Sequence, residues 1–427
     1  MPLIPPQLLR DPQPQHFDRL RERVAYARYR YNLNLAALVA LVAEEERRAE
    51  LLRRKRRWWL MNELRRESPA DFKSFLRVEP DLFLELVQRV GPRIEKSKKG
   101  RPPLQPGLKL AITLRFLATG NSFRSLEFSF RVAHNTISIF IPVVCQAIVD
   151  EYRQKVFKTP STPDEWRRVA QVFQDRWNFP HVCGAVDGKH VATRKPAHSG
   201  STYYTYKGYY SIVILVLADG EYKALWADVG SQGSDSDCGI FNRSGLLRSL
   251  ITGTIGFPPP EPLPNDDRDS GFFLLGDNAF PLREFMLKPF SKRYLNREEM
   301  VCNYRLSRAR RVVENLFGIM AKRFRCLLTT LDVEPERAMT ISNACITLHN
   351  LLRARYGLAP READEEDDQN QLMPGAWRTD AVMREVEDQA RAPRANAAGQ
   401  ALRSTFKAYF NSDAGSVPWQ LPILGFQ

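Results

Sequence analysis

The sequence predicts an α/β protein in which a mixed sheet flanked by helices follows an all-α region. Helical periodicity dominates up to about residue 178, and apolar runs of strand length begin after it. The run SIVILVLA over 211–218 is continuously apolar, as expected of a central strand covered on both faces. Asp219-Gly220-Glu221 then forms a hairpin turn into a strand over 222–229, so the sheet is expected to begin with antiparallel pairs.

Length and composition allow more than one domain. The chain has 427 residues, 43% of them hydrophobic, which is enough to bury a sizeable core. We expect a tail and basic helix over 1–66, a helical region over 67–178, an α/β domain over 179–356, and an acidic linker with a C-terminal tail over 357–427. We expect a helix over 16–66, an amphipathic helix over 72–94 and a packing helix over 336–356. The stretch 361–368 is dominated by Glu and Asp and is typical of a disordered linker.

The region before the sheet has a helix-turn-helix pattern. Its helices are expected over 108–119, 122–130 and 134–152, with a turn at Gly120-Asn121. The residues that would lead the recognition helix are Arg131, His134, Asn135 and Thr136. The pattern predicts an all-α DNA-binding region, with an ordinary helical bundle as the alternative.

Three acidic residues are candidates for a metal site. Asp187 lies inside the apolar strand over 182–191, Asp277 ends a second short strand, and Glu314 lies at the margin of the apolar stripe of a helix over 310–320. A buried ionised carboxylate costs several kcal/mol unless a cation or a hydrogen-bond network compensates it. Two acidic strand ends and one acidic helix are typical of an RNase H-like nuclease core, which holds two divalent ions.

The expected cofactor is a pair of Mg²⁺ or Mn²⁺ ions. Mg²⁺ prefers hard oxygen ligands and keeps several waters, so few protein ligands are needed. Two ions roughly 4 Å apart can activate a water or a 3′-hydroxyl on one side of a phosphodiester and stabilise the leaving oxygen on the other. Asp187 and Asp277 would bind or bridge the ions, and Glu314 would hold the second ion and help to position the nucleophile.

Further candidates flank these acids. Asp228 ends a strand, and Asp237 precedes a helix expected over about 238–250. Each is interpreted as a further metal ligand, an N-cap or a polar turn residue, and for Asp237 the cap is favoured. The glycines that would let a phosphate backbone approach closely are Gly188, Gly276 and Gly318.

The net charge of +14 favours a polyanionic partner. Nucleic acid is favoured over an anionic membrane because the sequence shows no amphipathic anchor or lipidation motif. Candidate DNA-binding residues near Glu314 are Arg308, Arg310, Arg311, Lys322 and Arg323, with a solvated basic helix as the alternative. The run Arg53-Arg54-Lys55-Arg56-Arg57 indicates a nuclear-import signal, a phosphate contact or a solvated helix face.

Cysteine usage and hydropathy indicate a compartment. The six cysteines are scattered singly without zinc-ligand spacing, as expected of small buried residues in a reducing environment. The N-terminus lacks a signal-peptide core, and no apolar run approaches the roughly 18 residues that span a bilayer. We expect an intracellular, soluble protein located in the nucleus, with the cytoplasm as an additional location.

Five motifs together resemble the PIF/Harbinger transposases and the Harbinger transposase-derived nucleases of animals. They are LRFLATGNSFRSLEFSFRVAHNTIS, CGAVDGKHV, DVGSQGSDSDCGIFNRS, LLGDNAFPL and NYRLSRARRVVENLFGIMAKRF, which cover most of residues 105–356. One departure is Phe280, where the family often has Tyr. Metal binding should be little affected, because neither side chain is a preferred Mg²⁺ ligand.

The resemblance implies an RNase H-like core with an Asp-Asp-Glu triad at Asp187, Asp277 and Glu314. It also implies Mg²⁺-dependent DNA cleavage and strand transfer at transposon ends, and a separate Myb/SANT-like partner that aids DNA binding and nuclear entry. We therefore expect a DNA endonuclease or transposase that can form a homo-oligomer. The rival interpretation is a domesticated DNA- or chromatin-binding protein that does not use the chemistry.

Overall fold

The computed structural model describes residues 14–95, 103–291, 293–379, 382–386 and 395–426, with side chains described outside 14–20 and 46–62. The chain divides into two compact units, Met1–Ser68 and Pro69–Gln427. The helical region and the sheet both belong to the second unit. The domain boundaries expected at residues 178 and 356 are not compact-unit boundaries and stay predictions.

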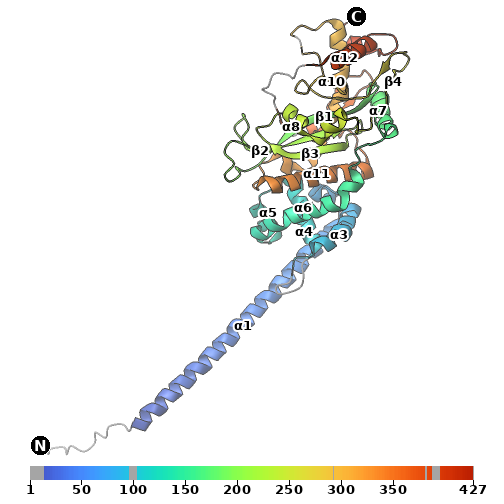
Figure 1. The fold of residues 1–427 in the computed structure, drawn as a ribbon. Coiled ribbons are helices and arrows are strands. Elements are labelled where there is room, and N and C mark those ends of the chain that lie inside the picture. The colour runs from blue at the N-terminus through green and yellow to red at the C-terminus, as the bar shows by residue number, and fades with distance from the viewer. Residues whose placement is uncertain (1–13, 96–102, 292, 380–381, 387–394, 427) are drawn as a thin grey trace, which may run out of the picture. The chain divides into compact units, whose positions relative to one another are not determined.

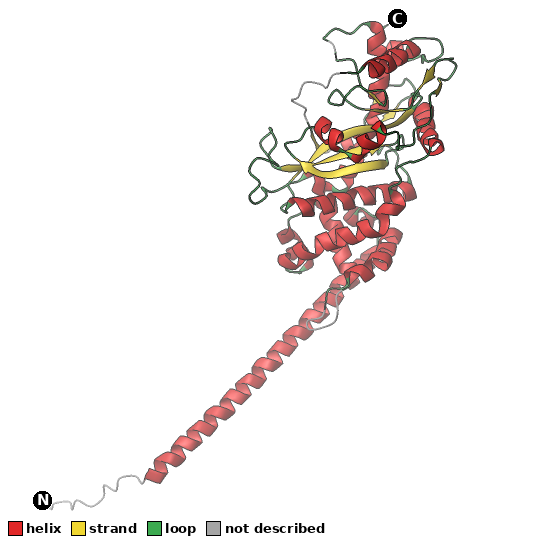
Figure 2. Ribbon diagram, in the orientation of Figure 1, coloured by secondary structure: helices red, strands yellow, loops and turns green. Residues whose placement is uncertain are grey.

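Helices and strands are shown by colour in Figure 2. The helices of the described chain are α1 (Pro14–Glu67), α2 (Pro69–Leu76), α3 (Pro80–Ile94), α4 (Pro106–Thr119), α5 (Phe123–Phe130), α6 (His134–Val156), α7 (Pro163–Trp177), α8 (Asp237–Arg243), α9 (Gly245–Ile251), α10 (Arg297–Arg323), α11 (Pro335–Tyr356), α12 (Ala397–Phe410) and α13 (Gln420–Ile423), with the 3-10 helices η1 (Arg325–Leu328) and η2 (Ala376–Thr379). The strands are β1 (Val182–Ala192), β2 (Ser211–Ala218), β3 (Ala224–Gln232), β4 (Glu261–Pro262), β5 (Asp269–Ser270), β6 (Phe273–Leu275), β7 (Met286–Leu287), β8 (Glu365–Glu366), β9 (Leu372–Met373) and β10 (Arg384–Glu385).

The described part of the first unit is formed by α1, a single continuous helix of 54 residues (Figure 1). Its side chains over 21–42 are all exposed. The expected import signal, Arg53-Arg54-Lys55-Arg56-Arg57, falls on the backbone of this helix, and its side chains lie outside the described ones.

The second unit is built on a mixed sheet. Six strands of its described residues form this sheet in the order β3-β2-β1-β6-β7, and β10 pairs with β1 beside that path. The β1, β2 and β3 strands are antiparallel, whereas β6 runs parallel to both β1 and β7. All eight residues of β2 are buried, as the unbroken apolar run predicts. The predicted mixed α/β class is therefore confirmed.

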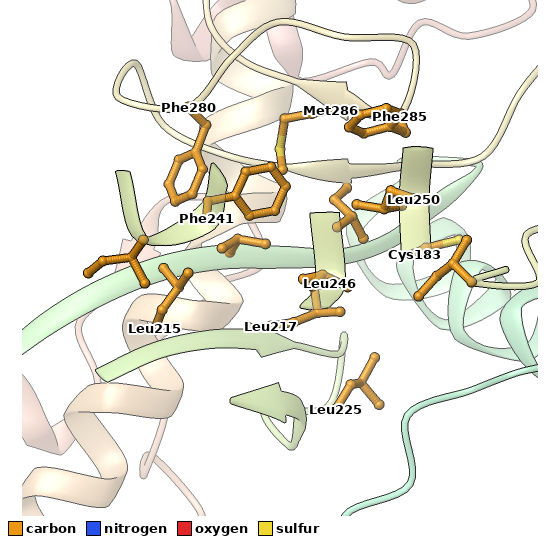
Figure 3. Close-up of a cluster of buried hydrophobic side chains, with 14 of the residues drawn as sticks. Cys183, Leu215, Leu217, Leu225, Phe241, Leu246, Leu250, Phe280, Phe285 and Met286 are labelled. Carbon is orange, nitrogen blue, oxygen red and sulfur yellow. The ribbon is translucent and has the colours of Figure 1, made fainter. Parts of the chain in front are cut away.

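Helices cover both faces of the sheet. On one face, α8 and α9 contribute Phe241 and Leu246 to an apolar cluster with Leu215 and Leu217 of β2 (Figure 3). Trp166 of α7 belongs to the same cluster. Figure 1 shows α8 and α11 on opposite sides of the sheet, with α6 beyond α11. The α10 helix packs against β1, β2 and β6. No single described helix is long and apolar enough to cross a bilayer, and α5 with α6 reaches that threshold only as a pair bent by 105°.

Two helices expected to be continuous are broken. The helix expected over 72–94 ends at Leu76, where Arg77 adopts a left-handed φ of 60°, and α3 starts at Pro80. Pro80 cannot donate a helical hydrogen bond to its preceding turn, which explains the new start. The helix expected over 238–250 divides at Ser244, whose side chain accepts a hydrogen bond from the Leu247 backbone and so caps α9.

The acidic stretch 361–368 is ordered, which corrects the expected disordered linker. Asp364 is only 4% exposed, and its carboxylate accepts hydrogen bonds from the Gly375 backbone at 2.8 Å and from Arg378 at 2.8 and 2.7 Å. Trp377 lies against α10 and donates to Asn315 Oδ1 at 2.7 Å. Specific tertiary partners for its acidic groups therefore order a segment whose composition alone indicates disorder.

A substitution at Gly318 of α10 tests the packing of Trp377 against this helix. A Cβ at Gly318 would lie 2.2 Å from the Trp377 ring. We expect Gly318→Ala to lower the free energy of unfolding in urea by about 1–3 kcal/mol through overpacking, although alanine ordinarily favours a helix over glycine by about 1 kcal/mol.

The matched control is Gly245→Ala, because nothing lies within 4 Å of a Cβ at Gly245. Its unfolding free energy should stay within about 0.5 kcal/mol of the wild type. In a Trp377→Ala background, Gly318→Ala should lose its penalty. A stabilised Gly318→Ala protein would contradict the close contact.

Candidate active site

Asp187 lies in the central strand of the sheet. All eleven residues of β1 are buried, and Asp187 is 3% exposed. Lys189, two residues further along the strand and so on the same face, places its Nζ 2.7 Å from Asp187 Oδ2. This Oδ2 is buried and accepts no well-aligned hydrogen bond from the described residues, so the contact is mainly an ion pair.

Asp277 lies beside Asp187 because of the parallel pairing of β1 and β6. Ala185 pairs with Leu275, and each aspartate follows its paired residue by two positions. Burial raises the pKa of Asp277, the negative charge of Asp187 raises it further, and Arg310 opposes both effects. Asp277 Oδ1 accepts a hydrogen bond from the Ala279 backbone at 2.9 Å. Two carboxylates thus meet in a partly dehydrated site.

Glu314 reaches the same site from α10, through Arg310. Arg310 donates to Glu314 Oε1 at 2.7 Å, and its other terminal nitrogen lies 3.8 Å from Asp187 Oδ1. Burial lowers the pKa of Arg310, but the negative charges of Asp187, Glu314 and Asp277 outweigh this effect and raise it overall. The Arg310 guanidinium therefore interacts electrostatically with all three carboxylates.

A fourth carboxylate comes from the C-terminal part of the chain. Lys189 and His190 of β1 pair with Glu385 and Arg384 of β10. The Glu385 side chain forms an ion pair with Lys189 and is 59% exposed. Burial lowers the pKa of Lys189, but the charges of Asp187 and Glu385 outweigh it and raise the pKa.

The three acids fit a divalent cation in donor type and in charge. Carboxylate oxygens are the ligands that Mg²⁺ and Mn²⁺ prefer, and the buried Asp187 Oδ2 has lone pairs that no well-aligned hydrogen bond uses. No group of three His, Cys, Asp or Glu in the described ranges is arranged as a ready metal cage. Arg310 and Lys189 supply the compensating positive charge in this arrangement.

Asp228 and Asp237 lie on the opposite face of the sheet from Asp187. Gly188 pairs with Leu215, and Leu215 pairs with Asp228, so this row faces the α8 side. A Cβ at Gly188 would lie 1.9 Å from Asp237 Oδ1, so the Asp237 carboxylate packs against that row. Neither acid shares a face with Asp187, which argues against both as further metal ligands. The N-cap of α8 is Ser236, which corrects the cap expected at Asp237.

The three glycines near the acids accommodate the protein's own side chains, which corrects their expected role in phosphate approach. Asp237 fills the space at Gly188, Phe280 lies 2.9 Å from a Cβ at Gly276, and Trp377 lies against Gly318. A side chain at any of these positions would clash with a packed neighbour. Their small size is therefore explained by internal packing.

The basic residues of α10 pair largely with the acidic C-terminal segment. Arg308 is 6% exposed and donates to Glu366 and to the Trp177 carbonyl. Arg311 also donates to Glu366, Arg323 donates to Glu362, and Lys322 donates to the Ala376 carbonyl. These contacts favour a structural role, and DNA contact by these residues stays a prediction.

The predicted recognition-helix residues lie at the corner between α5 and α6. Arg131 is exposed with a left-handed φ of 51°, and Asn135 is exposed in the first turn of α6. His134 Nδ1 lies 3.0 Å from Glu127 Oε2. The three residues lie on a different part of the fold from the acidic site, and their contact with DNA stays a prediction.

The sequence analysis did not identify Lys189, Arg310 or Glu385 as partners of the three acids. The period-two spacing of Asp187 and Lys189 indicates a shared strand face, and the four-residue spacing of Arg310 and Glu314 indicates a helical pair. Both signals were available. No local signal indicates Glu385, which lies 196 positions from its partner Lys189.

The raised pKa of Asp277 predicts a cost in stability. The folded protein binds the Asp277 proton more tightly than the unfolded chain, so the ionised side chain destabilises the fold at neutral pH. We expect Asp277→Asn to be more stable than the wild type in urea at pH 7.5. The difference should shrink as pH falls through the raised pKa and vanish below the ordinary value of 3.8.

An Asp269→Asn variant provides the control, because Asp269 is exposed. Its unfolding free energy should change by less than about 0.5 kcal/mol. An Asp277→Asn protein less stable than the wild type at neutral pH would contradict the predicted cost.

Comparisons with known proteins find one matching family and several relatives. Residues 186–350 match the family described as DDE superfamily endonuclease, a segment that includes Asp187, Asp277 and Glu314. The Rattus norvegicus protein "Putative nuclease HARBI1" is 26% identical over 273 residues, which cover 62% of this chain and 72% of that protein. Its Homo sapiens counterpart is 25% identical with the same coverage.

A plant protein is also similar to this chain. The Arabidopsis thaliana "Protein ALP1-like" is 23% identical over 254 residues, which cover 58% of this chain and 61% of that protein. No solved structure matches the chain. Over this segment the chain is therefore similar to DDE superfamily endonucleases and to these relatives.

Proposed function

We propose that the protein is a metal-dependent DNA endonuclease or transposase of the Harbinger type, with an RNase H-like core. The observation that supports this most directly is the meeting of three carboxylates around one partly buried cation, Arg310. Asp187 comes from the central strand, Asp277 from the neighbouring strand end and Glu314 from α10. The match of residues 186–350 to DDE endonucleases supports the same assignment.

Asp187 and Asp277 would hold a pair of divalent ions, Mg²⁺ or Mn²⁺, with Glu314 on the second ion. Such ions, when bound, activate a water or 3′-hydroxyl and stabilise the leaving oxygen of a phosphodiester. Lys189 keeps its proton and holds the Asp187 carboxylate in place. Arg310 links Glu314 to Asp187, so it keeps the α10 acid beside the strand acid.

DNA binding, nuclear location and the partner form part of the same proposal. The net charge of +14 favours a polyanionic partner. The 105° bend between α5 and α6 lies within the range of helix-turn-helix units, and it exposes Arg131 and Asn135. The run Arg53-Arg54-Lys55-Arg56-Arg57 would serve nuclear import, and a Myb/SANT-like protein would assist binding and entry.

A second candidate function is DNA or chromatin binding without cleavage. It is favoured by the position of Arg310, whose positive charge compensates the three acids without a metal ion. The two candidates differ in whether the acids are needed for phosphodiester cleavage.

Cleavage of labelled linear DNA with Mg²⁺ at low salt tests the proposal. We expect Glu314→Gln and Asp277→Asn to lose at least about 100-fold in rate, as expected when metal ligation is disrupted. DNA affinity should change much less. The control is Asp228→Asn, an acid on the other face of the sheet, which should cleave at the wild-type rate.

Two results would contradict the nuclease assignment. One is cleavage that survives in both triad variants. The other is tight, salt-sensitive binding by a wild-type protein that does not cleave, with and without the Myb/SANT-like partner. The second result would favour the DNA-binding candidate.

Arg310 gives a further prediction that does not depend on activity. Its positive charge lies among the acids, so it opposes a second cation in the same space. We expect Arg310→Gln to bind Mn²⁺ roughly tenfold more tightly than the wild type, measured by titration calorimetry without DNA. The exposed Arg283→Gln variant is the control. Unchanged or weaker Mn²⁺ binding by Arg310→Gln would contradict this competition.

A further inference from the structure

The α1 helix carries large apolar side chains that remain in solvent. Within 21–42 every side chain is exposed, including Tyr31, Leu35, Leu38 and Val42, whose exposed fractions range from 47% to 66%. Single apolar residues on a surface are normal, but a continuous group of them marks an interaction site. The helix is about 81 Å long at 1.5 Å per residue, so its surface is extended.

Five of the ten large apolar residues exposed on the described part of α1 follow a coiled-coil seam, and the other five, Tyr26, Tyr29, Leu33, Val39 and Leu41, lie off it. Spacings of four and three residues alternate along Val24, Arg28, Tyr31, Leu35, Leu38, Val42 and Glu45. This alternation places all seven on one stripe of the helix, with the period that two packed helices need. The two charged members, Arg28 and Glu45, lie toward opposite ends of the stripe. The centre of the seam is thus apolar, with a positive charge toward its N-terminal end and a negative charge at its C-terminal end.

The charges select both the partner and its direction. In an antiparallel pair of two α1 helices centred between Ala36 and Ala37, Arg28 of one copy faces Glu45 of the other. The apolar residues then match as well, because Tyr31 faces Val42 and Leu35 faces Leu38. In a parallel pair in register, Arg28 would face Arg28 and Glu45 would face Glu45 inside the seam. Like charges in a partly dehydrated seam repel, so the antiparallel pair is favoured.

We propose that α1 is a homodimerisation helix that pairs antiparallel with α1 of a second copy of this chain, with Arg28 and Glu45 fixing the register. One sequence supplies both halves of the complementary pattern, as a two-fold symmetric interface requires. The inference does not depend on nuclease activity.

A membrane is a poorer occupant of this stripe. The uncharged, mostly apolar run over 33–43 would extend about 16 Å as a helix at 1.5 Å per residue. The hydrocarbon core of a bilayer is roughly 30 Å thick. Arg28 and Glu45 also lie on the seam itself. Charged residues on the apolar stripe disfavour insertion, whereas each has a matching charge in the antiparallel pair.

Sedimentation equilibrium of the full-length chain tests the proposal. The wild type should be a dimer, and Leu35→Glu should raise the dissociation constant at least roughly tenfold. The matched control is Leu33→Glu, because Leu33 is exposed on the opposite side of the helix and lies two residues away. It should dimerise like the wild type. Far-UV circular dichroism checks that the variants keep their helix content.

A charge exchange tests the register and direction. Arg28→Glu alone should weaken the dimer roughly tenfold, and Arg28→Glu with Glu45→Arg should restore it, because the exchanged charges face each other again only in the antiparallel pair. Arg30→Glu, off the seam, should have little effect.

Four results would overturn the proposal. They are a monomeric wild type, equal losses in Leu33→Glu and Leu35→Glu, a dimer that neither Leu35→Glu nor Arg28→Glu weakens, and a double exchange that fails to restore association. A monomer that binds phosphatidylserine-containing vesicles through the same stripe would assign the helix to a membrane surface instead.

Discussion

The compensation of the buried Asp187 charge is the interaction on which the site depends. The carboxylate lies in a central strand, 3% exposed, where an unpaired charge would be strongly unfavourable. Lys189 from the same strand and Arg310 from α10 supply the positive charge. Because Arg310 belongs to α10 and Asp187 to β1, their ion pair joins the helix to the sheet, while Arg310 also binds Glu314 within α10. The acidic centre and the packing of its covering helix are thus one arrangement.

The second organising contact is between the basic α10 helix and the acidic C-terminal segment. Glu366 and Glu362 accept hydrogen bonds from Arg308, Arg311 and Arg323. Both segments have charge runs that, taken singly, indicate a solvated helix and a disordered linker. Together they neutralise each other and become ordered. The same C-terminal region supplies Glu385, so it also completes the surroundings of the acidic site.

The site also shows why residue type and residue role are separate questions. Gly188 and Gly318 are small because Asp237 and Trp377 occupy the space beside them, although glycines next to catalytic acids suggest a phosphate path. Asp228 and Asp237 are acidic, yet the pairing of Gly188, Leu215 and Asp228 places them across the sheet from Asp187. Residue chemistry identifies candidates, and strand register decides which of them can act together.

The sequence by itself determined the α/β class, the main strands, most helices and the three acids that lie together, because these depend on short-range periodicity and on a charge within an apolar strand. The alternating spacing of the seam on α1 is likewise a local pattern of the sequence. Only the tertiary structure decided that Arg310 also lies beside Asp187, that Glu385 pairs with Lys189, and that the acidic C-terminal segment pairs with α10. Those contacts join residues far apart in the chain, such as Lys189 and Glu385 at 196 positions, and no local pattern records such a pairing.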